Sequence, residues 1–274
     1  MVSRWNHSRP RWWQRIKSAC RWPRPSSVPS PLARLPLNLI LFEKADSEAT
    51  LPPDDPRAAH LRDVLRLEPG DDFDVAAING PRGKATFVED GPEGIGLTFR
   101  WEGIIQNDLL PMRLLAGLPR PQTARKILEQ AAALGTSEMD FFGADKGEPS
   151  YADSKLWTTE EWRRHLVRGV EQAFCSFLPE VRRWNNLQEA LDTLPGLGAR
   201  LALDVYEAGE PLSPTPAEGT EGVILAVGPE SGWSPRERDL LREAGFVLHH
   251  LGQRVLRQET ACVAALGILA SRLW

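Results

Sequence analysis

Two short segments near the end of the chain combine glycine-containing loops with residue types that bind ligands and stabilise charge. The first runs from Gly228 to Gly232 (GPESG), and the second runs from Leu251 to Leu256 (LGQRVL). Glycine adopts positive φ at little cost and lets a ligand approach the backbone closely. Arg257, Glu259 and Thr260 follow the second loop directly. The pattern predicts a pocket built largely from main-chain groups, with a cation and a carboxylate beside it.

Each loop comes directly after an apolar stretch, so a sheet must hold the two loops together. From Met112 onward, stretches typical of strands alternate with amphipathic stretches typical of helices. Capping boxes at Thr158–Glu161 and Ser234–Glu237 mark two helix starts. This alternation predicts an α/β fold with a mostly parallel sheet. The predicted strands are 112–118, 139–143, 201–206, 223–227 and 246–251, and the predicted helices are 123–134, 158–174, a helix from 235 that Gly245 closes, and 259–273.

Residues 38–103 have a different, β-rich pattern. Asn, Asp, Gly and Pro cluster between the apolar stretches and favour the backbone conformations of tight turns. We therefore expect two domains, a small β-domain over 38–105 and an α/β domain over 110–274. The small domain has predicted strands at 38–42, 72–78, 84–88 and 95–101, turns at 79–83 and 90–94, and a short helix around 58–67.

Residues 1–37 contain eight Lys and Arg, four Trp and no acidic residue. They lack a core pattern, so we expect a disordered basic extension. Three interpretations remain open, which are a transit peptide, a basic aromatic arm that helps to bind RNA, and a gene start placed too far upstream of Leu37. We favour the third.

Removing residues 1–37 is expected to leave folding and activity nearly intact, because they offer no apolar pattern that a core could use. The measurement compares the solubility, thermal stability and activity of a chain that begins at Asn38 with those of the full chain. An insoluble or inactive shortened chain would show that the extension matters.

The composition excludes several classes of protein. No stretch approaches the roughly 18 apolar residues of a membrane span. The three cysteines are far apart, which argues against a disulfide scaffold and favours a cytoplasmic protein. No Cys/His cluster has zinc-ligand spacing, and the neighbours His249 and His250 would point to opposite faces of a strand, so no metal site is expected. Beyond residue 37 the chain carries 25 Lys and Arg against 37 Asp and Glu, so RNA binding needs a local basic patch.

Familiar nucleotide-binding and hydrolase motifs are missing from the sequence. It has no complete G-x-G-x-x-G, no phosphate-binding G-x-x-x-x-G-K-[ST] and no G-x-S-x-G nucleophile motif. This argues against a Rossmann dinucleotide-binding fold and against a P-loop NTPase. The two glycine loops are therefore the main indication of function.

The two loops closely resemble those of the bacterial 16S ribosomal RNA uracil-N3 methyltransferase family. The similar segments are GPESGWSP-x-E from Gly228 and LG-x-RVLR-x-ETA from Leu251. The similarity extends over nearly all of 38–274. Other matching positions are 60–70, Lys126, Glu129, Gln130, Leu134, Gly135, Glu171, Gln172, Pro179 and Glu180.

The resemblance implies a trefoil-knotted SPOUT methyltransferase domain, with helices on both faces of a parallel sheet, preceded by a small PUA-like β-barrel. It implies a homodimer that binds S-adenosylmethionine in the knot and acts on 16S ribosomal RNA or the small ribosomal subunit, with no membrane partner. The expected cofactor-binding residues are Leu203, Gly228, Pro229, Glu230, Gly232, Leu251, Gly252, Val255, Leu256 and Thr260. The expected RNA-binding residues are Arg62, Arg66, Arg120 and Lys126.

Methylation at uracil N3 requires that the N3 proton leave before or during attack. Arg257 is the predicted catalytic cation that stabilises the uracil anion. Glu259 is the second catalytic candidate, either as the base or as a residue that orients Arg257 through an ion pair. The alternative is that Glu259 and Thr260 only cap the last helix.

Several positions depart from the family pattern. Ser231 stands where the family usually has glycine, Asp63 replaces an Arg, and Glu171-Gln172 lacks the Arg that usually follows. Ser231 is small enough to leave cofactor binding intact. Because the loss of the two Arg residues weakens the predicted RNA surface, the target nucleotide stays open. Two other functions also stay open, namely a SPOUT ribose 2'-O-methyltransferase and a non-catalytic RNA-binding assembly factor.

Overall fold

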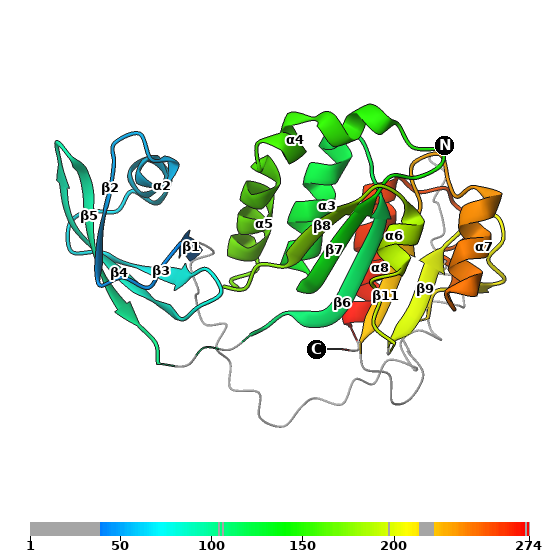
Figure 1. Ribbon diagram of the computed structural model, residues 1–274. Helices are drawn as coiled ribbons and strands as arrows, with labels where there is room; N and C mark the ends of the chain where they lie inside the picture. Colours follow the sequence, from blue (N-terminus) through cyan, green and yellow to red (C-terminus); the bar gives the residue numbers. More distant parts are fainter. Residues whose placement is uncertain are drawn as a thin grey trace, which may run out of the picture. The chain divides into compact units, whose positions relative to one another are not determined.

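The computed structural model describes residues 39–103, 105, 107–196, 198–213, 222–271 and 273. The expected basic extension, residues 1–37, lies outside this part of the chain. The described residues form two β-sheets with helices packed against them (Figure 1). None of these helices is long and apolar enough to span a bilayer.

The smaller sheet, as far as the chain is described, has five strands in the order β1-β3-β4-β5-β2. β1 runs parallel to β3, and the other neighbours are antiparallel. Alternate residues such as Val75, Phe87 and Leu97 are buried in one core, which Leu61 completes. The strand bounds are β1 Leu39–Phe42, β2 Glu48–Leu51, β3 Asp72–Ala77, β4 Arg82–Gly91 and β5 Gly94–Trp101.

Two features of this sheet differ from the sequence prediction. β2 is unexpected, because its sequence EATL is short and only its last residue is buried. The helix expected around 58–67 lies two residues earlier, since α2 spans Pro56–Ala59 and continues as a π-helical turn, η1, over His60–Leu65. Arg66 ends this turn in the left-handed conformation at φ 54°, before the Pro and Gly that were expected to end it.

The larger sheet has seven strands among the described residues, in the order β10-β12-β9-β11-β6-β7-β8, and all neighbours are parallel. All five residues of β11 are buried, as expected for a strand covered on both faces. The predicted α/β fold with a parallel sheet is confirmed. The bounds are β6 Leu110–Gly117, β7 Thr136–Phe142, β8 Glu180–Trp184, β9 Ala199–Leu203, β10 Glu210–Pro211, β11 Val223–Val227 and β12 Val247–His250.

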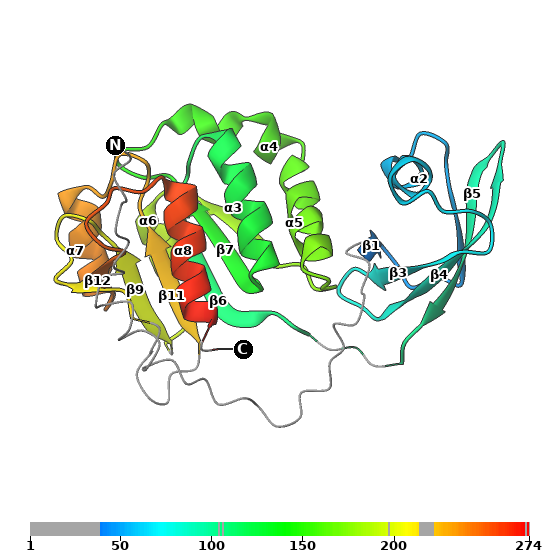
Figure 2. The same cartoon turned by 180° about the vertical axis from the view of Figure 1, so that it is seen from behind.

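Helices cover both faces of the larger sheet (Figures 1 and 2). On one face, α3, α5 and α8 share a core with strand residues such as Leu114 and Leu225. On the other face, α6 and α7 pack against Leu115 and Ile224. The bounds are α3 Pro121–Ala133, η2 Pro149–Asp153, α4 Lys155–Thr158, α5 Glu161–Gln172, α6 Leu187–Leu191, α7 Pro235–Glu243 and α8 Gln258–Ala270.

The two predicted capping boxes have different outcomes. The box at Ser234 is confirmed, with Glu237 bonding back to the backbone N–H of Ser234. The box at Thr158 is wrong, because Thr158 ends α4 and α5 begins after Glu160. Glu160 has a left-handed backbone at φ 56°, so the helix expected over 158–174 begins only at Glu161, as α5, and the preceding α4 is a separate turn.

Candidate functional site

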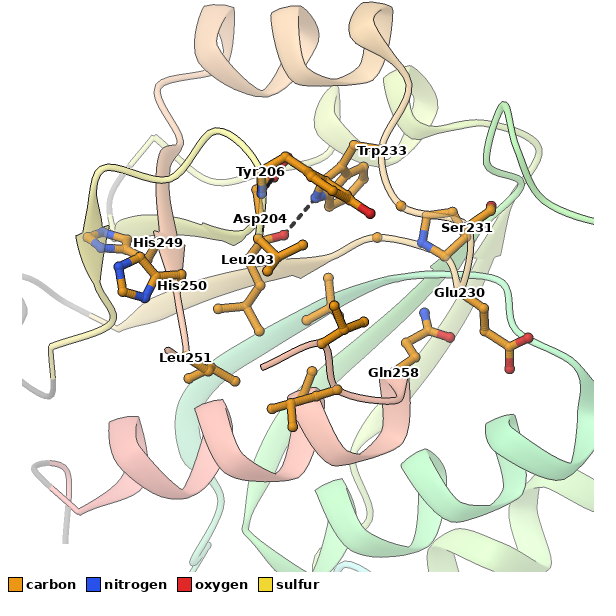
Figure 3. A pocket seen from close by; sticks show the side chains of 18 of the residues that line it. Leu203, Asp204, Tyr206, Glu230, Ser231, Trp233, His249, His250, Leu251 and Gln258 are labelled. Carbon is orange, nitrogen blue, oxygen red and sulfur yellow. Dashed lines mark hydrogen bonds between the residues drawn. The ribbon is translucent and has the colours of Figure 1, made fainter. Parts of the chain in front are cut away.

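A cavity opens at the carboxyl ends of β9, β11 and β12 (Figure 3). Parallel strands bring their carboxyl ends to one edge of the sheet, where connecting loops commonly form ligand sites. Because β9 lies between β11 and β12, the loops that follow these strands face the same space. The lining residues are 203–206, 227–233, 249–252, 254–256, Arg238, Gln258 and Ala261.

The loop after β11 is anchored by Trp233. Its indole is only 2% exposed, and Nε1 donates a hydrogen bond to the carbonyl oxygen of Leu203 at 2.8 Å. A Cβ placed on Gly228 would lie 3.0 Å from the indole Cε2. Glycine at 228 is therefore required by close packing rather than by positive φ. The left-handed residue of this loop is Gly232, at φ 74°.

The loop after β12 turns at Gly252, which has φ 105°. Its backbone N–H donates a hydrogen bond to Nδ1 of His250 at 3.0 Å. Val255 and Leu256 line the cavity although their side chains are 80% and 37% exposed. Exposed apolar side chains around a cavity indicate a surface that a ligand covers.

A buried ion pair shapes the wall of the cavity after β9. The side chains of Asp204 and Arg238 are 1% and 9% exposed, and Nε of Arg238 donates to Oδ2 of Asp204 at 2.5 Å. Oδ1 of Asp204 accepts from the backbone N–H groups of Tyr206 and Glu207 at 2.6 and 3.0 Å. Although burial opposes ionisation, these hydrogen bonds hold the pKa of Asp204 below its ordinary value. The carboxylate therefore stays charged and fixes the loop backbone.

Two glutamates beside the loops are paired with residues of α3 or its N-terminus. Glu230 accepts a hydrogen bond from Oγ1 of Thr123 at 3.1 Å, and its carboxylate lies 3.3 Å from Nε of Arg120. Glu259 accepts from Nζ of Lys126 at 3.1 Å. Burial tends to raise the pKa of Glu259. Hydrogen bonds from its own backbone N–H and from Lys126 outweigh this effect and lower the pKa. A carboxylate with a lowered pKa is a weak base.

Arg257 is the N-terminal capping residue of α8, and its side chain is exposed. Its carbonyl oxygen accepts from the N–H of Ala261, whereas its side chain makes no capping hydrogen bond. Within the described part of the chain, its guanidinium makes no ion pair, so the ion pair with Glu259 that we considered is not formed. Arg257 follows the cavity-lining loop directly without itself lining the cavity.

Nine of the ten residues predicted to bind the cofactor line this one cavity. Thr260 is the exception, because it is exposed and lies in a second, shallow groove with Lys126 and Gln130 of α3. Thr260 is the third residue of α8, where the turn of the helix points its side chain away from the cavity. The nine that the structure brings together are Leu203, Gly228, Pro229, Glu230, Gly232, Leu251, Gly252, Val255 and Leu256.

The cations predicted to bind RNA differ in their surroundings. Nε of Arg62 donates to Asp90 at 2.8 Å, and Arg120 and Lys126 are paired with glutamates as described. Arg66 makes no ion pair with any described residue. Three of the four positive charges are therefore partly neutralised in the free protein.

Sequence reasoning missed Asp204, Tyr206, Trp233 and Arg238, all of which line the cavity. Trp233 directly follows the first glycine loop, and this position could have indicated it. The pairing of Asp204 with Arg238 joins residues 34 positions apart and has no local signal in the sequence.

The departure at Ser231 is accommodated locally. Its hydroxyl donates a hydrogen bond to the carbonyl oxygen of Lys146 at 2.7 Å, and Nζ of Lys146 donates to the carbonyl oxygen of Trp233 at 2.9 Å. Serine therefore ties the first glycine loop to the loop after β7.

The site offers binding and charge stabilisation rather than covalent chemistry. Burial raises the pKa of the thiols of Cys175 and Cys262 to about 12, so both stay protonated at neutral pH and are poor nucleophiles. Among the described residues, no group of His, Cys, Asp and Glu could hold a metal ion.

The chain is similar to known RNA-modifying proteins. The family model of an RNA methyltransferase domain matches residues 106–270. The chain is 31% identical over 244 residues to the ribosomal RNA small subunit methyltransferase E of Treponema pallidum, covering 85% of this chain and 90% of that protein. It is 26% identical over 237 residues to the ribosomal RNA small subunit methyltransferase E 1 of Borreliella burgdorferi, covering 86% and 99%.

Solved structures share the fold. The ribosomal RNA small subunit methyltransferase E from Neisseria gonorrhoeae, bound to S-adenosyl methionine, superposes with a TM-score of 0.71 at 21% identity, covering 86% of this chain and 97% of that chain. A probable rRNA-methyltransferase from Porphyromonas gingivalis gives a TM-score of 0.70 at 22% identity, covering 86% and 98%. At these identities the likeness establishes the mixed α/β architecture alone.

Proposed function

Since this chain belongs to the family of ribosomal RNA small subunit methyltransferases E, we propose that it transfers a methyl group from S-adenosylmethionine to N3 of a uracil in 16S ribosomal RNA. The observation that carries the proposal is the single cavity that the two glycine loops share, with the exposed cation of Arg257 directly after it. A ribosomal RNA substrate also favours a cytoplasmic protein.

The residues of the cavity fit S-adenosylmethionine. Leu203, Leu251 and Leu256 offer apolar surface for an adenosine, and the backbone of the two glycine loops offers hydrogen-bonding groups. When bound, the cofactor supplies a methyl group on a positively charged sulfur, which makes the methyl carbon electrophilic. The contribution of this chain is then to orient the reactants, because an in-line displacement gains mainly from positioning.

Arg257 is proposed to stabilise the negative charge that develops on the uracil as N3 loses its proton. Its guanidinium makes no ion pair with a described residue, so among these residues it is available to a substrate, although its charge contributes to the lowered pKa of Glu259. Glu259 is a weaker candidate for the base, since it is paired with Lys126 and its pKa is lowered. The pairing favours a role for Glu259 in joining α8 to α3.

Replacing Glu259 with Gln is expected to lower turnover by less than about tenfold, whereas loss of a general base costs about 10²–10⁴. The pKa of Glu259 lies below its ordinary value of 4.5, so its carboxylate gains a proton only as the pH falls through that lowered value. Single-turnover rates of both proteins should therefore show the same pH dependence at neutral and alkaline pH. A loss of about 10² or more, together with the disappearance of the fall in rate at acidic pH, would make Glu259 the base.

RNA binding is proposed for the predicted cations. Arg62 lies in η1 and Arg66 ends it, within the part of the chain, 38–105, that we propose is a PUA-like barrel. Arg120 and Lys126 belong to the proposed methyltransferase domain over 110–274. The small sheet has an apolar core of its own, which supports this division, while Leu39, Leu41 and Ala76 pack in the core of the larger sheet. Phosphate oxygens can replace the carboxylates that now pair with these side chains.

A trefoil knot is proposed for the end of the chain. α8 packs against α3 and β11, whereas β12, which precedes α8, lies beyond β9 in the sheet. The segment 251–257 must therefore cross the carboxyl ends of β9 and β11. Because the chain turns back in this way from β12 to β11, the arrangement supports a knot.

A homodimer is proposed through the outer side of α8. Val263, Ala264, Gly267 and Ile268 are only half-buried there, although their side chains are small or apolar. A second copy would cover this surface. Sedimentation of the protein over a range of concentrations measures the oligomeric state.

The test of the proposed function is the nucleoside content of 16S ribosomal RNA from a strain that lacks this gene. Mass spectrometry should detect the loss of N3-methyluridine, and the wild-type gene should restore it whereas the Arg257→Ala gene should not. Loss of a ribose-methylated nucleoside instead would favour the 2'-O-methyltransferase. An unchanged nucleoside content, with no S-adenosylmethionine binding in a calorimetric titration, would favour the assembly factor.

A further inference from the structure

Tyr206 is an exposed aromatic residue on the wall of the cavity. Its side chain is 77% exposed, which is unusual for a large ring beside a ligand site. It projects from the end of β9 toward the loop that carries Ser231 (Figure 3). A Cβ placed on Gly232 would lie 3.9 Å from Cε2 of the Tyr206 ring, so the ring reaches the neighbouring glycine loop.

Both the backbone and the ring of Tyr206 are held in place. Its backbone N–H donates to Oδ1 of Asp204 at 2.6 Å, and the buried Asp204 carboxylate is fixed in turn by Arg238. The guanidinium carbon of Arg238 lies 6.0 Å from the centroid of the Tyr206 ring, within the range of a cation–π contact. A buried ion pair thus lies beside a ring that stays 77% exposed.

The rest of the cavity supplies apolar surface against which the second face of a flat group stacked on Tyr206 could pack. Leu203, Leu251 and Leu256 line the same space as Tyr206. An aromatic ring and aliphatic side chains around one cavity suit a flat, largely apolar group, and base–aromatic stacking tolerates any nucleobase. Arg238 occupies the cation–π position on Tyr206, so the ring is pre-organised before a ligand arrives.

We propose that the ring of Tyr206 stacks on the adenine of S-adenosylmethionine and is the main side-chain determinant of cofactor affinity. This inference rests on the proposed function. The uracil is the other flat group in the reaction, but Arg257, the cation proposed to stabilise it, does not line the cavity. The planar group that enters the cavity beside Tyr206 is therefore the adenine.

The experiment measures calorimetric dissociation constants of S-adenosylmethionine and of 5'-methylthioadenosine, which keeps the adenosine and lacks the amino acid. Tyr206→Ala is expected to weaken both ligands by about tenfold or more, the effect typical of a stacked base. Tyr206→Phe keeps the ring and should bind both ligands as the unsubstituted protein does. Val247→Ala is the matched control, since Val247 is 57% exposed on the neighbouring strand and does not line the cavity.

Each outcome has a distinct meaning. If Tyr206→Ala loses affinity for S-adenosylmethionine and keeps it for 5'-methylthioadenosine, the ring contacts the methionine part and the proposal is overturned. If both affinities are unchanged while KM for the small ribosomal subunit rises at saturating cofactor, the ring belongs to the RNA site and the proposal is likewise overturned. If the unsubstituted protein binds neither ligand, the proposed function itself fails, and the inference fails with it.

Discussion

Replacing Arg257 with Ala is expected to lower the single-turnover rate of methylation by about 10²–10³, while the dissociation constant of S-adenosylmethionine stays nearly unchanged. A cation beside the developing uracil anion stabilises the transition state more than the ground state, so its loss affects the rate selectively. The rate and the cofactor affinity should respond differently, because Arg257 is exposed at the start of α8 and does not line the cavity.

The Arg257→Ala protein should fold normally, which keeps the result interpretable. The side chain of Arg257 makes no capping hydrogen bond, and the one that its carbonyl accepts from Ala261 survives any substitution of the side chain. Arg164→Ala is the matched control, since Arg164 is an exposed arginine on α5. Arg257→Lys tests whether the guanidinium binds two oxygens at once. If it does, the Lys variant should be nearly as slow as the Ala variant.

Two results would remove Arg257 from the proposed role. A rate equal to that of the unsubstituted protein would show that the cation has no part in the chemical step. A parallel loss of cofactor affinity would make Arg257 a cofactor or structural residue. An equal loss of rate in Arg164→Ala would trace the effect to the removal of a positive charge that attracts RNA, whatever its position.

The sequence predicted the strands around the cavity well because they are buried on both faces. β11 is an uninterrupted apolar stretch, and its predicted bounds of 223–227 agree with the structure. β8 was missed because its sequence, EVRRW, has no apolar run. It lies at the edge of the sheet, where half-exposed positions can be charged. Such a strand is defined by its pairing with β7, which no local pattern reveals.

The same contrast holds within the candidate site. The glycine loops could be found from the sequence because backbone conformation and close approach restrict a position to glycine, as at Gly252 with φ 105°. The residues that hold the loops in place could not. Trp233 donates to a carbonyl oxygen 30 positions away, and Arg238 pairs with a carboxylate 34 positions away. These contacts exist only after the sheet has brought β9 and β11 together.

The position of Thr260 illustrates where a motif misleads. In the sequence, Thr260 belongs to the same motif, RVLR-x-ETA, as residues that line the cavity. α8 begins at Gln258, however, so residues beyond that point turn about 100° per position around the helix axis. Gln258 and Ala261 face the cavity, and Thr260 faces the groove beside α3.

Replacing Gly228 with Val is expected to weaken S-adenosylmethionine binding by at least about tenfold while the protein stays folded. The new Cβ would lie 3.0 Å from the indole of Trp233, which is closer than side chains normally pack. The indole cannot easily move, since it is buried, bonded to the carbonyl oxygen of Leu203 and stacked on Phe142 at 5.9 Å between centroids. Forcing extra methyl groups into a packed site costs about 1–3 kcal/mol.

The glycine loop is the part that can give way, because Gly228 is only half-buried whereas Trp233 is 2% exposed. Its displacement would open the cavity between Leu203 and Gly232 and remove the backbone groups that we expect to hold the cofactor. Calorimetric titration with S-adenosylmethionine measures the loss, and thermal unfolding checks the fold. Gly209→Val is the matched control, since a Cβ at Gly209 meets nothing within 4 Å. Normal affinity in Gly228→Val would place the cofactor somewhere other than this cavity, whereas equal losses in both variants would trace the effect to the general flexibility of glycine in loops.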